Sequence, residues 1–199
     1  MIAPSHHLLR NKHITNFNRF RELKSYFPVF CICIIFSIAY CVLSFVRHDN
    51  YQSFGFDLGI NDQIIWKYSR LLPPLTTIDH VTGIPKLFVH AEFFYILLSP
   101  LFWIWNDVRL LLFVQNAVFC FSAVPIYLIA KKYDISLWIR YAVMLSYLTF
   151  FGVQNALWFD FHSSVFGAAF TAWFLYFLIT GNSVWTFISF LLAILSKEN

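Results

Sequence analysis

The sequence predicts an all-α protein, a polytopic bundle of transmembrane helices. Hydrophobic residues make up 59% of the 199 residues, aromatic residues 21% and charged residues only 12%, a composition too apolar for an ordinary soluble domain. Several charge-free runs are also long enough to cross a bilayer as helices. The abundant aromatic residues suit helices that face lipid and end in anchors at the membrane surface. The lipid bilayer is therefore the first partner that the sequence implies.

Residues 1–26 are predicted to form a cytoplasmic N-terminal tail. The basic residues of this tail indicate membrane topology and no nucleic-acid partner, because the net charge of the whole chain is only +4. An excess of basic residues next to a span marks the cytoplasmic side. The tail carries one acid, Glu22, against Arg10, Lys12, Arg19, Arg21 and Lys24.

The membrane domain, residues 27–199, begins with a span over residues 27–46. This run has no charge and reaches about 30 Å as a helix, the thickness of the hydrocarbon core. Pro28 is expected in the first turn, where the missing N–H has no helical partner. The span leads from the inside to the outside.

Residues 47–109 then form an exoplasmic loop with two expected interfacial helices. Over residues 57–72 apolar residues recur at helical spacing with a polar face between them, and Pro73-Pro74 ends that helix. Residues 93–105 are apolar but only thirteen in number and contain Pro100, so we expect an interfacial or re-entrant piece, too short to span.

Four more spans follow, over residues 110–130, 141–159, 163–180 and 184–199. The second span ends at Lys131-Lys132, which places its end in the cytoplasm. The spans then alternate, and Gly181-Asn182-Ser183 makes the turn between the last two. Because the final run is short, we expect the chain to be the N-terminal part of a longer membrane protein.

This topology gathers ionisable residues on the exoplasmic side, where charges at membrane depth mark function or buried pairing. Carboxylates there could bind a divalent cation or act as a general base on an acceptor hydroxyl. Structural roles remain open beside these: Asp57 as the cap of the surface helix, Asp160 as another cap, and Asp62 paired with a neighbouring base. The gathered residues are Asp57, Asp62, His90, Glu92, Asp160, His162, Lys197 and Glu198.

Several motifs together resemble the prokaryotic membrane family called domain of unknown function two thousand and seventy-nine. The resemblance runs in order from about residue 54 to the C-terminus, and its most specific element is the first. The matching elements are Phe56-Asp57-Leu58-Gly59-Ile60, Asp62-Gln63, Trp66, His90, Ser99-Pro100-Leu101, Gln115, Pro125-Ile126-Tyr127, Asp160-Phe161-His162 and Lys197-Glu198. The family typically has Lys-Glu-Asp where this chain ends in Lys197-Glu198-Asn199, and its members are typically longer.

That family is in turn similar to the C-type integral-membrane glycosyltransferases (GT-C), whose first exoplasmic loop holds a catalytic acid and juxtamembrane helices. The resemblance implies a sugar donor on polyprenyl phosphate and a catalytic set of Asp57, Asp160 and His162. The same three residues are the implied ligands of a divalent cation, Mg or Mn. The implied substrate-binding residues are Lys197, Glu198, Asp62, Gln63, Arg70 and His90.

Two other functions stay open from the sequence. A lipid or polymer transporter or flippase component would have polar groups along the middle of its spans, where this chain offers mainly Gln115 and Asn116. An inactive, truncated membrane protein is the other alternative to a glycosyltransferase. The expected location for all three is the plasma (inner) membrane of a prokaryote, with the N-terminus in the cytoplasm.

Overall fold

The fold was obtained as a computed structural model, which describes the backbone of residues 6–78 and 93–196 and the side chains of residues 26–78 and 93–196. Within these ranges every regular element is a helix, so the predicted all-α class is confirmed. The elements are α1 (His6–Asp49), the π-helix η1 (Gly55–Gly59), α2 (Ile60–Ser69), α3 (Phe94–Leu98), the 3₁₀-helix η3 (Ser99–Trp103), α4 (Arg109–Phe121), α5 (Ala123–Lys132), α6 (Leu137–Leu148), α7 (Phe151–Trp158), α8 (Ser163–Thr180) and α9 (Ser183–Ser196).

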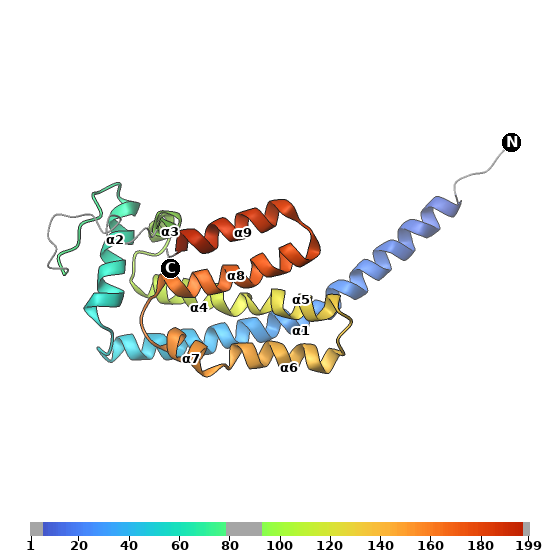
Figure 1. The fold of residues 1–199 in the computed structure, drawn as a ribbon, viewed down its shortest axis with the longest axis horizontal. Coiled ribbons are helices and arrows are strands. Elements are labelled where there is room, and N and C mark those ends of the chain that lie inside the picture. Colours follow the sequence, from blue (N-terminus) through green and yellow to red (C-terminus); the bar gives the residue numbers. More distant parts are fainter. Residues whose placement is uncertain (1–5, 79–92, 197–199) are drawn as a thin grey trace.

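Roughly antiparallel passes form the bundle (Figure 1). They are α1, the pair α4 and α5, the pair α6 and α7, and then α8 and α9. α1 packs on α4, α5 and α7, and α8 packs on α4, α5 and α9. The short elements α2 and α3 lie together at one end of the bundle, and the N-terminal part of α1 projects beyond the other end (Figure 1).

Three helical stretches of the described chain are long and apolar enough to cross a membrane. They are Tyr26–Asp49, Arg109–Lys132 and Ser163–Thr180. The third has the bounds predicted from sequence, because the β-type backbone of His162 precedes α8 and a left-handed Gly181, with φ of 75°, ends it. Only glycine adopts that conformation without strain. These stretches confirm a polytopic membrane bundle.

Three helix boundaries differ from the sequence expectation. The first helix already begins at His6, within the predicted N-terminal tail, so Pro28 lies inside α1 and not in a first turn. Residues 110–130 form two helices, α4 and α5, that meet at Ser122. Residues 141–159 likewise divide into α6 and α7, and the buried hydroxyl of Tyr40 donates to the carbonyl oxygen of Leu148 (2.6 Å) where α6 ends.

The two short segments of the first loop also form helices with their own bounds. The expected helix over residues 57–72 begins as η1 and continues as α2, which ends before the positive φ of Leu71 (55°). The stretch over residues 93–105 forms α3 and η3, with Pro100 in the first turn of the 3₁₀-helix. Pro is accepted there because a first-turn N–H has no helical partner.

A hydrophobic cluster at the end of the bundle that holds α2 positions the candidate site. It joins α2 and α3 to the neighbouring ends of α4 and α8, so these two helices of the first loop pack directly onto the bundle. Burial of such side chains contributes about 1.5–3 kcal/mol each. Its most buried members include Ile64, Ile65, Phe102, Leu111, Phe161 and Phe166.

Candidate functional site

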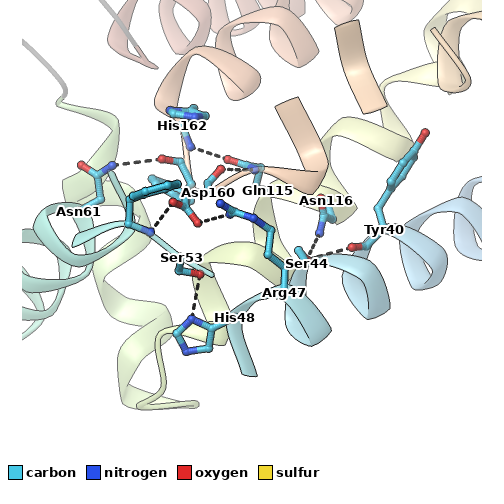
Figure 2. A network of polar contacts seen from close by, with 12 residues as sticks. Tyr40, Ser44, Arg47, His48, Ser53, Asn61, Gln115, Asn116, Asp160 and His162 are labelled. Atoms are coloured by element: carbon cyan, nitrogen blue, oxygen red, sulfur yellow. Dashed lines mark hydrogen bonds and ion pairs between the residues drawn. The ribbon is translucent and has the colours of Figure 1, made fainter. Parts of the chain in front are cut away.

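A buried ion pair joins α1 to the segment before α8. Nη1 of Arg47 lies 2.7 Å from Oδ1 of Asp160, and the two side chains are 7% and 0% exposed (Figure 2). Since an unpaired charge at such depth is costly, each residue needs the other. Asp160 was expected to be a catalytic carboxylate or a helix cap, and its observed partner is Arg47 in the last turn of α1.

Aromatic rings surround the guanidinium of this pair. Its carbon lies 4.7 Å from the ring centroid of Phe159, 5.6 Å from that of Trp158 and 5.7 Å from that of Phe54. The electron-rich faces of such rings attract a cation, most strongly where water is excluded. The rings therefore take over part of the stabilisation that water would give to Arg47.

The second carboxylate oxygen of Asp160 fixes the chain just ahead of η1. The backbone N–H of Phe54 donates to Oδ2 at 2.8 Å. Phe54 immediately precedes the π-helix Gly55–Gly59, which carries Asp57. Asp160 thus links the end of α1 to the start of the first loop, and it also determines where the turn bearing Asp57 begins.

Two buried amides hold the backbone of residues 160–162 (Figure 2). Gln115 of α4 donates through Nε2 to the carbonyl oxygen of Asp160 (3.2 Å) and accepts the N–H of His162 at Oε1 (2.7 Å). Asn61 of α2 donates to the carbonyl oxygen of Phe161 (3.3 Å) and accepts the hydroxyl of Tyr95 (2.9 Å). Gln115 was expected to face protein, and it does so as a clamp on this segment.

Asp57 has a different environment from Asp160. It is half-buried, and its carboxylate forms no hydrogen bond or ion pair with any residue whose side chain the structure describes. The expected role as a side-chain cap of the surface helix is absent, since neither η1 nor α2 has a side-chain cap bond. Asp57 is therefore a carboxylate with its acceptor capacity open, on a turn held from both sides.

The predicted metal set of Asp57, Asp160 and His162 does not fit a divalent cation. Both oxygens of Asp160 already accept hydrogen bonds, from Arg47 and from Phe54. The ring of half-buried His162 stacks parallel on Phe159, with centroids 5.4 Å apart at 4°. Among the described side chains no three His, Cys, Asp or Glu residues come together as metal ligands, so this ligand set is not formed.

Asp62 and Gln63 lie on α2 in distinct roles. Burial, reinforced by the charge of Asp107, raises the pKa of Asp62 from 3.8 to about 6, since a desolvated carboxylate is disfavoured. The amide of Gln63 is bonded to Thr77: Nε2 donates to its hydroxyl (3.0 Å) and Oε1 accepts its N–H (2.9 Å). Gln63 thereby holds the return of the loop against α2.

Of the remaining predicted substrate-binding residues, the structure describes only Arg70, which is exposed. The guanidinium of Arg70 lies over the ring of Trp66, 5.8 Å from its centroid, at the end of α2. Asp62 pairs with neither Lys67 nor Arg70. Lys67 donates instead to the carbonyl oxygen of Leu75. His90, Lys197 and Glu198 lie outside the described residues, as does Glu92.

Comparison with known proteins decides the family. Residues 47–199 match the family model described as "Predicted membrane protein (DUF2079)". The chain belongs to this family. The match begins at Arg47 and includes the Arg47–Asp160 pair, so the resemblance seen in the sequence motifs is confirmed. No curated protein and no solved structure matches this DUF2079 protein.

Sequence reasoning missed several residues that organise this part of the DUF2079 region. Arg47 counted only as the first residue of the exoplasmic loop, Phe54 carried no signal, and Asn61 was one polar residue on a helix face. A charge at the rim of a span usually reaches water, so nothing local indicated that Arg47 turns inward. Its partner is 113 positions away along the chain.

Proposed function

We propose that this chain is part of a membrane glycosyltransferase that takes its sugar from a polyprenyl phosphate at the exoplasmic face, with Asp57 as general base. The observation that carries the proposal is the contrast between two aspartates. Asp160 is fully paired, whereas Asp57 is half-buried with an open carboxylate on the turn that Asp160 holds. Carboxylates that serve as bases need such open acceptor capacity at a fixed position.

The reaction balances with Asp57 alone as the proton acceptor. The Asp57 carboxylate takes the proton of an acceptor hydroxyl, and the hydroxyl oxygen attacks the anomeric carbon of the sugar. The bond from that carbon to the phosphate oxygen breaks, and polyprenyl phosphate leaves with the bonding electrons. A fixed cation would stabilise the developing phosphate charge, and Arg70, exposed just after α2, is one cation among the described residues that could do so.

Asp160 and His162 take positioning roles in this proposal. Asp160 sets the start of the turn that carries Asp57, through the N–H of Phe54. His162 continues the segment that Gln115 and Asn61 hold. No step of the proposed reaction passes through a metal ion, because the residues first expected to bind one do not gather.

The architecture supports placing these residues at the exoplasmic side. α2 and the junction of α7 with α8 lie at one end of the bundle, while the lysines that close α5 lie at the other (Figure 1). There Lys131 donates to the hydroxyl of Tyr26 (2.6 Å) and Lys132 to the carbonyl oxygen of Ile179 (2.5 Å). Lysines next to spans favour the cytoplasm, and in that orientation Asp57 faces outside in a prokaryotic plasma membrane.

The test is sugar transfer in membranes that contain the full chain. Proteoliposomes supplied with polyprenyl-phosphate-linked [³H]mannose or [³H]glucose and host membrane fractions are followed for radiolabel that leaves the lipid extract. Asp57→Asn is expected to reduce transfer by at least 100-fold, in the range usual for loss of a general base. Asp134→Asn makes the same chemical change on the exposed turn before α6 and is expected to leave transfer unchanged. Full transfer by Asp57→Asn would refute the proposal.

A further inference from the structure

A small cavity lies between α2, η3 and the turn that leads into α4. Its volume is about 260 Å³, and its lining combines two aromatic rings, two carboxylates, two amides and one aliphatic side chain: Trp66, Phe102, Asp62, Asp107, Gln63, Asn106 and Val108. Pockets for drug-sized ligands are larger, roughly 300–1,000 Å³. The cavity is therefore of a size suited to a single small ring.

The walls of the cavity are held in place by bonds outside it. The hydroxyl of Ser69 donates to the carbonyl oxygen of Trp66 (2.6 Å), and the indole N–H of Trp103 donates to the carbonyl oxygen of Ser69 (2.7 Å). These bonds tie η3 to the end of α2. The ring of Phe102 is buried, 2% exposed, so this wall of the cavity is fixed before any ligand arrives.

The two carboxylates differ in what they offer to a ligand. Asp107 is bound by Arg109, whose Nη1 lies 3.0 Å from Oδ2 and whose backbone N–H donates to Oδ1 (2.8 Å). Asp62 has no hydrogen bond or ion pair with the described residues. Ionised carboxylates are acceptors only, so of the two carboxylates in the lining Asp62 is the one with its acceptor capacity open, and Asp107 is compensated by Arg109.

The charges around the cavity favour a neutral ligand over a cation. Arg109 compensates Asp107, and the guanidinium of Arg70 covers one side of Trp66 at 5.8 Å. Both arginines contact residues of the lining, so their positive charges offset those of the two carboxylates for a ligand in the cavity. A sugar ring instead presents hydroxyl donors at its edge and C–H groups on its faces, which match a carboxylate, an amide and two aromatic walls.

We propose that this cavity is a monosaccharide subsite that binds one neutral pyranose ring, with Asp62 accepting hydrogen bonds from vicinal hydroxyls and Trp66 and Phe102 packing against the ring. This inference deepens the proposed function, on which it rests for the presence of a sugar substrate. It assigns Asp62 to sugar recognition and leaves Asp57 as the base.

The test measures sugar binding directly, without transfer. The full chain in nanodiscs free of sugar-based detergent is probed by saturation-transfer difference NMR with methyl α-D-mannopyranoside and methyl β-D-glucopyranoside, and with choline as a cation of similar size. Ring protons of at least one glycoside are expected to receive saturation, and Asp62→Asn and Trp66→Leu are expected to weaken the signal at least five-fold. Asp134→Asn and Trp138→Leu, matched changes at exposed positions, are expected to leave it unchanged.

Three results would overturn the subsite: no saturation of either glycoside, saturation of choline alone, or a glycoside signal that survives in both Asp62→Asn and Trp66→Leu. Asp57→Asn separates this inference from the proposed function. If that variant binds glycoside normally and has lost transfer, both proposals stand. If it still transfers sugar while Asp62→Asn has lost binding, the catalytic role of Asp57 falls and the subsite stands.

Discussion

The Arg47–Asp160 pair makes a quantitative prediction about stability. Asp160→Asn keeps the shape of the side chain and an acceptor for the N–H of Phe54, but it removes the negative charge that faces Arg47. The guanidinium is then buried, 7% exposed, without a counter-charge. Breaking one side of a buried pair costs about 3–5 kcal/mol, and for a chain of this size each kcal/mol lowers Tm by roughly 2–4 °C. The expected loss is therefore about 6–20 °C.

A double-mutant comparison separates the charge from the shape. Arg47→Met removes the cation and keeps an apolar chain against Phe54, Trp158 and Phe159. Arg47→Met combined with Asp160→Asn leaves no buried charge, so it is expected to be more stable than either single variant. Replacement of a whole buried pair by neutral groups is often close to neutral. Asp57→Asn is the matched control, since its carboxylate has no hydrogen-bond or ion-pair partner among the described side chains.

Thermal denaturation of the purified protein, followed by fluorescence-detected gel filtration after heating, gives the comparison. Only relative Tm values at one heating rate are used, because membrane proteins commonly unfold irreversibly. The reasoning is refuted if Asp160→Asn melts within about 2 °C of the wild type, or if the double variant melts below both single variants.

Two further predictions concern pH and topology. Because the folded pKa of Asp62, about 6, lies above its ordinary value of 3.8, its stabilising contribution is complete below pH 3.8 and is lost as pH rises through 6. At pH 7.5, Asp62→Asn is therefore expected to raise the free energy of unfolding by about 1 kcal/mol, after allowance for partial exposure of the carboxyl, and so to raise Tm. At pH 4 it is expected to leave Tm unchanged. Equal Tm differences at both pH values would contradict this. For topology, a membrane-impermeant maleimide applied to intact cells should label Gln52→Cys but not Ser136→Cys, both exposed positions, with the wild-type signal subtracted; labelling of Ser136→Cys would reverse the orientation.

The fold was predictable where the information lies within one run of residues. Composition identified the membrane bundle, and the run before Gly181 identified α8, because a glycine in the left-handed region is a local stop signal. The division between α6 and α7 had no such signal. At this division the hydroxyl of Tyr40, which lies on α1 and 108 positions away along the chain, donates to the carbonyl oxygen of Leu148. Tertiary contacts of this kind override local helical preference.

The candidate site was predictable in location and less so in its roles. The charge pattern placed Asp57 and Asp160 toward one side, and the structure joins their segments through the N–H of Phe54. The sequence treated both aspartates as equivalent acids. Their difference arises because Arg47 turns inward to Asp160, and neither residue type nor spacing shows where a guanidinium points. Whether an acid is paired is a property of packing.

The buried pair also bears on how the protein is made. Arg47 is synthesised 113 residues before Asp160, an interval of roughly 6–23 s at about 5–20 residues per second. During that time Arg47 has no counter-ion, because Asp160 has not yet been synthesised. Its guanidinium must therefore be solvated by water or lipid headgroups while α1 is already in the membrane. Docking of α1 is thus complete only once the chain has been synthesised beyond α7. The biosynthetic machinery must therefore tolerate an unfinished first span while most of the domain is still being translated.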